Sequence, residues 1–536
     1  MTETRSPATA EPEPPAPAVA APPKGGPAGM LGHGDHKTTG RLFIGCSLVF
    51  LVVAGAAGAL LGIEKVDPAT IDVLTGESLA VAFTLHNVGS VFLFLLPLTL
   101  GLAIYVVPLQ VGSSTIAFPR AAAAAFWTWL LAGVLLLVSY GIDAGPAGTD
   151  RNAILLWITA LGAVTVALTL ATLCVVTTVL TLRAEGMRLE RVPMFSWSML
   201  AAGTVWILSL PVLVAVLLLL WLDVRYDVGL LAVTGGIGSH VAWVFLPPQI
   251  LAFAVPALGV VADVVPVFAK VRLAPRNVFL GLIGAAAALG FGAWMFIVPE
   301  ADRLPDQALF VLMGLAAALP VLGFTGGVAD AFRRGTLSVA PPVLAAVLGL
   351  LLILGGVAAG AFGVLPFNNL VPTTWFGGEA HLVLGGSAVV LLGGIYHWAP
   401  KIWGRVLPDG TGRLAAVAAF GGVGLLALPD LITGGLGQVS RLPATQEVDD
   451  AWSALNVVSL AGGGLLLLAV VLVMVSAAGA LGGTRKDAAS TPDDPWEGHT
   501  LEWATSSPPP VGNFADPPAV ESATPLLDRR EAEAES

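Results

Sequence analysis

Long apolar runs recur along this chain, and they constrain its fold more than any other feature. The 536 residues are 56% hydrophobic and only 11% charged, far outside the composition of soluble globular proteins. Runs of about 20 apolar residues can cross bilayer hydrocarbon as helices, where backbone polar groups must be paired internally. No barrel-like alternation is present, so we expect an all-α integral membrane protein. Twelve transmembrane helices are predicted, near residues 41–63, 83–107, 121–141, 154–182, 198–222, 229–266, 276–298, 307–329, 340–364, 375–398, 413–435 and 454–480.

The charges between the spans predict an orientation. If the amino terminus is cytoplasmic, the loops on that side carry most of the lysines and arginines, and the opposite loops are acidic. This bias follows the positive-inside rule, and an even number of spans then places both termini in the cytoplasm. The net charge of −11 comes largely from outer loops and the carboxyl-terminal tail, so it indicates no nucleic-acid partner.

Composition divides the chain into three parts. Residues 1–33 are rich in proline and alanine and read as a disordered cytoplasmic arm. Residues 34–482 form the membrane domain, and 483–536 form a cytoplasmic tail rich in proline and acidic residues, which we expect to be mostly non-helical. The two cysteines lie within spans without metal-type spacing and are expected to be core residues.

Four of the seven histidines lie in or at the edge of spans: His86, His240, His381 and His397. A single histidine in a helix bundle is more often a hydrogen-bonded packing residue than a ligand. His86 and His381, however, lie near the same membrane face on the second and tenth spans. Two imidazoles at equal depth can supply both axial ligands of a haem iron. Sequence spacing alone does not show that these two helices touch.

Several motifs, taken in chain order, resemble subunit I of the bacterial haem–copper oxidases, the cytochrome c oxidase type. Chance matches to all of them in order are very unlikely, and they cover the chain from about residue 34 to 514. They are "GDHKTTGRLFIG" (34–45), "FTLHNVGSVFLFLLPLTLGLAIYVVPLQVG" (83–112), "AFPRAAAAAFW" (117–127), "GGIYHWAPKIWGR" (393–405), "LNVVS" (455–459) and "DPWEGHTLEWATSSPPP" (494–510).

The resemblance implies a low-spin haem between the second and tenth helices. His86 matches one axial ligand without a gap, and His381 in "TTWFGGEAHLVL" (373–384) matches the other. An alignment anchored on "GIYHWAPK" would instead put Ala380 at the second position; we favour His381 as the only histidine on that half of the helix. Glu379 stands where the family has the proximal histidine of its oxygen-binding haem. We expect its carboxyl to be protonated or hydrogen-bonded, and the alternative is a weak iron or proton site.

The family's copper ligands are replaced in this sequence. Pro247 stands at the histidine of the copper motif on helix six, with Gln249 and Leu251 at its glutamate and tyrosine. Phe296 and Ile297 replace the histidine pair after helix seven. None of the three ligand positions offers a side-chain donor atom to copper, so we predict that copper is absent and that these residues form an apolar pocket.

Two groups of the family's proton paths are replaced as well. Thr115 stands at an aspartate and Phe324 at a lysine. Arg441 matches one of two loop arginines that bind haem propionates, whereas Leu442 replaces the other. Arg441 fits a plain surface loop residue equally well. Trp398 and Trp403 read as anchors at the membrane interface.

Three functions remain open at this point. The first is a respiratory subunit of the bacterial plasma membrane that keeps one low-spin haem, of a or b type, and transfers electrons. It would work with subunits II and III or their equivalents and take electrons from a cytochrome or a copper protein. The second is an active terminal oxidase, and the third is a non-catalytic membrane scaffold of the same fold. The chain has no C-x-x-C-H haem attachment motif.

Overall fold

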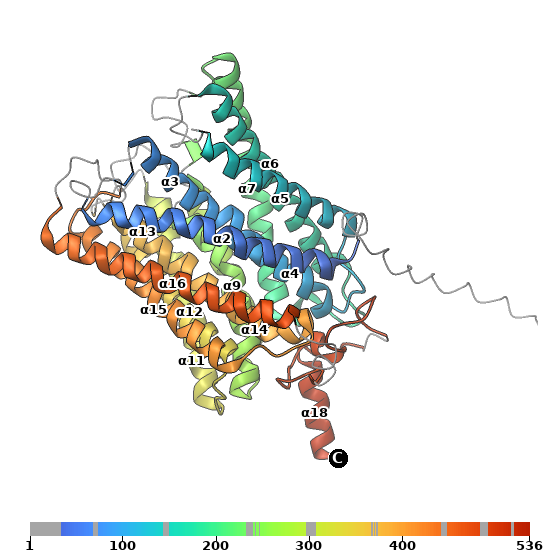
Figure 1. Cartoon of the computed structure of the whole chain (residues 1–536). Helices are drawn as coiled ribbons and strands as arrows, with labels where there is room; N and C mark the ends of the chain where they lie inside the picture. The colour runs from blue at the N-terminus through green and yellow to red at the C-terminus, as the bar shows by residue number, and fades with distance from the viewer. Residues whose placement is uncertain are drawn as a thin grey trace, which may run out of the picture.

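A computed structural model describes residues 34–67, 73–74, 76–142, 150–231, 240–241, 243–245, 247–295, 307–365, 368, 370, 373–440, 448–482, 491–515 and 519–536. Within these ranges the chain is helical and no strand is formed. Twelve helices are long and apolar enough to cross a membrane, which confirms the predicted fold class. Figure 1 shows them as a bundle of long, roughly aligned helices.

Two of the twelve spans are built from an α-helix, a π-helix and a second α-helix in succession. The second span is α3 (Gly76–Val88), η1 (Gly89–Leu95) and α4 (Leu96–Gln110), and the tenth is α13 (Thr374–Ala380), η6 (His381–Gly385) and α14 (Gly386–Trp403). The remaining spans are α2 (His36–Val66), α5 (Pro119–Gly141), α6 (Arg151–Thr181), α7 (Met194–Tyr226), α9 (Pro247–Ala269), α10 (Arg276–Met295), α11 (Ala308–Arg334), α12 (Pro341–Gly363), α15 (Asp409–Gly435) and α16 (Asp450–Gly482).

The sixth span differs from its prediction. A single long span over 229–266 was expected, whereas the membrane helix is α9, Pro247–Ala269, preceded by the short 3-10 turn η3 (Trp243–Phe245). Proline lacks a backbone N–H and fits best in the first turn of a helix. Pro247 and Pro248 therefore begin this helix rather than kink its interior.

The centre of the bundle is formed by the second, sixth and tenth spans. In their most apolar stretches 94%, 100% and 89% of the residues are buried, compared with 28% for α11 and for α16. The predicted haem ligands lie on two of these central spans. Outer helices pack through small residues: Gly422 of α15 and Gly462 of α16 meet where an added Cβ would lie within 2.6 Å of backbone atoms of the other helix.

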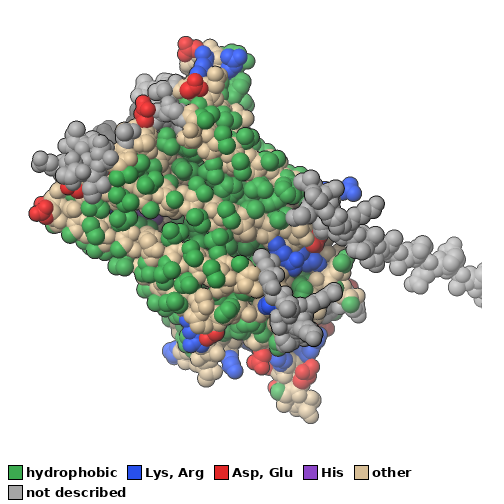
Figure 2. Space-filling model, in the orientation of Figure 1, with side chains coloured by type: hydrophobic (Ala, Val, Ile, Leu, Met, Phe, Trp, Pro, Cys, Tyr) green, Lys and Arg blue, Asp and Glu red, His purple; other side chains and the backbone are tan. Residues whose placement is uncertain are grey.

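Surface chemistry matches a membrane-spanning bundle. Figure 2 shows apolar side chains covering the flank of the molecule, with charged side chains gathered near its ends. A band of exposed apolar surface this large is expected only against lipid or another protein. The chain is therefore a multi-pass membrane protein.

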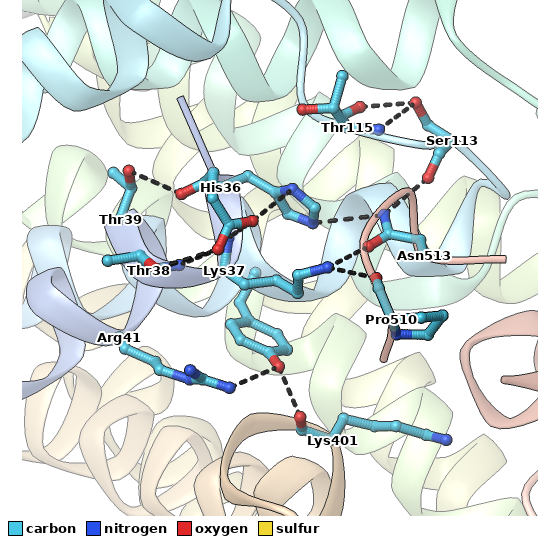
Figure 3. Close-up of polar contacts among 12 residues, drawn as sticks. His36, Lys37, Thr38, Thr39, Arg41, Ser113, Thr115, Lys401, Pro510 and Asn513 are labelled. Carbon is cyan, nitrogen blue, oxygen red and sulfur yellow. Dashed lines mark hydrogen bonds and ion pairs between the residues drawn. The ribbon is translucent and has the colours of Figure 1, made fainter. Parts of the chain in front are cut away.

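The described part of the tail packs against one end of the bundle, called here the tail face, where α2 begins and α4 and α14 end. Residues 491–515 are mostly non-helical, and the chain finishes in a helix, α18 (Pro525–Glu535). The ammonium of Lys37 donates to the carbonyl of Pro510 (2.6 Å) and to Oδ1 of Asn513 (3.2 Å), as Figure 3 shows. Lys401 donates to the carbonyls of Thr505 (2.6 Å) and Asp493 (3.0 Å).

Glu502 of the tail is fully buried within this contact. Its Oε1 accepts hydrogen bonds from Gln110 (3.1 Å) and Trp398 (3.3 Å), and the same Gln110 amide also donates to Asp263 (2.8 Å). Its Oε2 is buried with no hydrogen-bond partner among the described residues. The prediction that Trp398 anchors the chain at the membrane interface is wrong, because this side chain is fully buried, with Phe195 of α7 and Glu502 of the tail among its contacts.

These contacts make docking of the tail dependent on pH. Burial, followed by the nearby Asp263 carboxylate, raises the pKa of Glu502 from 4.5 to about 7. A raised carboxyl pKa stabilises the docked state fully below pH 4.5, and this contribution is lost as the pH rises to about 7. Burial, together with Arg530 and Arg272, lowers the pKa of His499 to about 4, which weakens docking as the pH falls from 6.5 to about 4.

We predict that Glu502→Gln removes the loss of docking between pH 5 and 8, because glutamine cannot ionise. The shift of the Glu502 pKa corresponds to an upper bound of about 3 kcal/mol. Hydrogen–deuterium exchange of peptides from 491–515, corrected for the intrinsic exchange rate, measures it. Glu497→Gln, which changes an exposed carboxyl of the same segment, is the matched control. Equal pH dependence in the wild type and in Glu502→Gln would contradict the prediction.

Candidate functional site

His86 and His381 face each other between the second and tenth spans. Their ring centres lie 5.8 Å apart, and the ring planes are inclined by 57°. His86 lies in the last turn of α3, and His381 is the first residue of η6. Both residues are half-buried, and Nδ1 of His381 is itself buried, with no hydrogen-bond partner among the described residues. The structure therefore brings together the two histidines that the sequence could not show to be in contact.

Helix α2 fixes the orientation of the His86 ring. Nδ1 of His86 lies 3.0 Å from the carbonyl oxygen of Ala54, an acceptor that requires the proton to be on Nδ1. The lone pair is then on Nε2, which is the arrangement found in most metal-binding histidines. Gly58, one turn further along α2, lies so close that an added Cβ would be 2.7 Å from Nδ1 and 2.8 Å from Cε1. The ring is thus held in a cradle that only glycine permits.

A π-helix accompanies each of the two histidines. η1 begins three residues after His86, and η6 begins at His381 itself. A π-turn holds one residue more than an α-turn, and such turns in membrane and soluble proteins are frequent at functional sites. The π-helix η6 also begins next to Ala380, where the two alignments of the tenth span differ by one residue. Sequence analysis missed both π-helices, because no residue pattern distinguishes them from α-helix.

Glu379 points to the other side of the tenth span. It is 3% exposed, and it forms no hydrogen bond or ion pair with another described residue. Its carboxyl packs against α12, where a Cβ at Gly360 would lie 2.5 Å from Oε1. The carboxyl borders an apolar cavity of about 30 Å³, which is room for one or two water molecules. The cavity is lined by Leu251, Gly314, Ala317, Val357, Gly360, Ala361, Val364, Glu379 and Val383.

This cavity joins two positions that the resemblance assigns to the oxygen-reducing centre. Leu251 stands for the tyrosine of the copper motif, and Glu379 stands for the proximal histidine. Apart from the Glu379 carboxyl, the side chains that line this cavity are apolar. The side chain of Pro247 and the residues Phe296 and Ile297 lie outside the described part of the chain, so their predicted apolar pocket stays a prediction.

The other residues singled out by sequence lie apart from the histidine pair. Arg441 and Leu442 are outside the described residues, so the role of Arg441 stays a prediction. Phe324 is fully buried on α11, with its ring against Phe279 at 5.4 Å. Thr115 lies in the turn after α4, where its carbonyl accepts from the Ser113 hydroxyl (2.6 Å). His397 is buried on α14 at the tail face, beside Trp503.

Sequence analysis also missed an ion pair between Lys65 at the end of α2 and Asp430 of α15. The available signal was an acidic residue inside an apolar span, which is costly in a bilayer unless it is paired.

The twelve-helix bundle and its facing histidines define a helical membrane protein suited to holding a cofactor between the second and tenth spans. Residues 38–465 match the sequence family described as "Cytochrome C and Quinol oxidase polypeptide I". The chain belongs to this family, the subunit I family of the haem–copper oxidases.

Named relatives agree with this assignment. Cytochrome c oxidase subunit 1 of Synechocystis sp. is 30% identical over 91% of this chain and 90% of its own length. The haem–copper oxidase subunit I+III of Aeropyrum pernix is also 30% identical, over 91% of this chain and 61% of its own length. A solved haem–copper terminal oxidase dimer has the same fold, with a TM-score of 0.68 at 14% identity, covering 84% of each chain.

We predict that Gly58→Ala destabilises the protein by about 1–3 kcal/mol, the usual cost of overpacking a well-packed site. The new methyl group must displace the His86 ring and with it the bond to Ala54. Thermal unfolding of the detergent-solubilised protein measures the change. Gly55→Ala on the same helix is the control, since a Cβ there meets only Leu467, at 3.9 Å. Equal stability of the two variants would show that His86 is not held as described.

Proposed function

We propose that this cytochrome c oxidase subunit I-like respiratory protein binds one low-spin haem through His86 and His381 and transfers electrons without reducing oxygen. The observation that carries the proposal is the facing pair of imidazoles on central spans of the bundle. The two alternative functions are an active terminal oxidase and a scaffold without a cofactor. The spectroscopic test described below distinguishes them from the proposed function.

The geometry of the pair fits axial ligation. A metal–imidazole bond is about 2 Å long, so two imidazoles on opposite sides of one metal ion have ring centres about 6 Å apart. The separation of 5.8 Å agrees with this value. The Ala54 carbonyl leaves Nε2 of His86 free to bind, and hydrogen bonding at Nδ1 raises the basicity of such a ligand.

The bound haem would supply a one-electron ferric/ferrous couple, and the protein supplies its environment. His86 and His381 would both hold the haem iron, which would leave it no open site for a gas. Ala54 and Gly58 hold the first ring, and η6 presents the second. Arg441 is a candidate contact for the propionates. Electron transfer requires no proton path, in agreement with Thr115 and Phe324 at positions where the family has an aspartate and a lysine.

The oxygen-reducing centre would be absent. Pro247, Phe296 and Ile297 offer no donor atom to copper, and Glu379 is a hard, anionic group where the family uses a neutral nitrogen. The apolar cavity between Leu251 and Glu379 supports this part of the proposal, because it offers a second haem no histidine. Copper and a second haem are therefore not expected in this chain.

The proposed setting is a respiratory complex of the bacterial plasma membrane, with both termini in the cytoplasm. Other subunits, equivalent to subunits II and III, would accompany this chain, and a cytochrome or a copper protein would donate electrons. The Aeropyrum relative supports such a partnership, since its name records a fusion of subunits I and III. The haem would be of a or b type.

We predict that His381→Ala abolishes the six-coordinate low-spin spectrum of the purified protein, because the iron loses one axial ligand. His86→Ala has the same effect. Glu379→Gln leaves the spectrum nearly unchanged, since this side chain faces the opposite side of the helix. His240→Ala is the matched control for a histidine outside the pair. Visible absorption of the oxidised and dithionite-reduced proteins measures all four.

Two results would reject the proposal. A large carbon monoxide difference spectrum in the unmodified protein would show an open iron site, as in an active oxidase. Complete lack of haem in membranes that contain the folded chain would leave only the scaffold.

A further inference from the structure

A polar network lies at the face opposite the tail, beyond the histidine pair. The Lys65 ammonium pairs with Oδ1 of Asp430, and both side chains are mostly buried, at 19% and 9% exposure. The Ser459 hydroxyl donates to the same Asp430 oxygen (3.2 Å). The Thr374 hydroxyl donates to the Asp430 backbone carbonyl (2.9 Å), and Asn456 donates to the Lys65 backbone carbonyl (2.8 Å). Four separate spans, α2, α13, α15 and α16, thus meet around one ion pair.

The network lies above the histidine pair on both of the helices that flank it. Lys65 follows Gly58, the residue against the His86 ring, by seven positions on α2. Thr374 precedes His381 by seven positions on α13 and η6. Seven residues make two helical turns, which returns to the same helix face after about 10 Å.

Asp430 keeps the lysine inward. A lysine near the end of a span normally extends toward the aqueous boundary, with its ammonium in water. Here the ion pair with α15 and the backbone contact with α16 hold Lys65 against the bundle instead. A buried ion pair is poor as a stabilising device, because the desolvation penalty offsets most of the attraction. The net free energy that this ion pair contributes to folding is therefore small. A purely structural role does not explain why Lys65 is held away from water.

We propose, resting on the function proposed above, that Lys65 is a binding residue for the carboxylates on the edge of the haem and raises its reduction potential. Haem carries two carboxylates on one edge, and these require cationic partners when they are buried. Lys65 is a cation on the correct face of α2, at a separation from the histidine pair that a haem can span. Asp430 is a positioning residue that acts through Lys65.

An anionic lipid headgroup offers the same chemistry to a lysine at this depth. A measurement of the haem reduction potential distinguishes a haem carboxylate from a lipid headgroup as the anion bound by Lys65. A lipid contact at the edge of the bundle leaves the iron unaffected. A positive charge near the haem favours the ferrous form, which carries one positive charge fewer than the ferric form. A unit charge about 10 Å away in partly buried surroundings changes an equilibrium constant by about tenfold.

The test is redox potentiometry of the purified, haem-loaded full chain. Lys65→Met is expected to favour the ferric form by about tenfold, which is about 59 mV for a one-electron couple. Asp430→Asn is expected to change the potential in the opposite direction, because it removes a negative charge. Lys65→Arg keeps the charge and is expected to stay near the wild type. Lys270→Met, at an exposed lysine on the tail face, is the matched control.

Opposite shifts in Lys65→Met and Asp430→Asn support the proposal. Unchanged potentials in both variants, with an intact low-spin spectrum, overturn it while the proposed function stands. If Lys65→Met loses its haem, the shift of Asp430→Asn decides alone. A wild-type chain without haem overturns the proposed function and this inference together.

Discussion

The contact between the His86 ring and helix α2 is the constraint on which the rest of the site depends. The ring can lie there only because Gly58 has no Cβ and because the Ala54 carbonyl accepts from Nδ1. Any larger residue at Gly58 would collide with the ring and require it to move. The pair then places two polar rings, with their centres 5.8 Å apart, between central spans of an otherwise apolar bundle.

The two sides of the tenth span have opposite character. One side presents His381 to His86. Two turns before His381 in the span, the Thr374 hydroxyl donates to the backbone carbonyl of Asp430, the partner of Lys65. The other side presents Glu379 to an apolar cavity that also contains Leu251. This asymmetry is consistent with the proposal that the tenth span holds a haem on one side and offers no metal ligand other than Glu379 on the other. Replacing donors by apolar side chains removes a metal site, but it leaves the packing of a membrane bundle intact.

Much of this could be predicted from sequence, because hydrophobic length alone identifies spans in a bilayer. All twelve spans were predicted, and His86 and His381 were assigned from the resemblance before their contact was known. Other features gave no local signal. The π-helices at the two histidines have ordinary apolar sequences, and the inward position of Lys65 depends on Asp430, 365 residues away. The hydrogen bond from Trp398 to Glu502 connects α14 to the tail, which composition described only as rich in proline and acidic residues. Arg441 and the proposed copper-pocket residues Phe296 and Ile297 lie outside the described residues.

The most direct test of the central claim is the haem and metal content of the purified chain. Pyridine haemochrome analysis combined with copper determination after dialysis gives both quantities per polypeptide. One haem and no equimolar copper is the predicted result, since one histidine pair is present and the copper ligand positions carry no donor atoms. Two haems together with one copper per chain would contradict the account and would show an active oxidase.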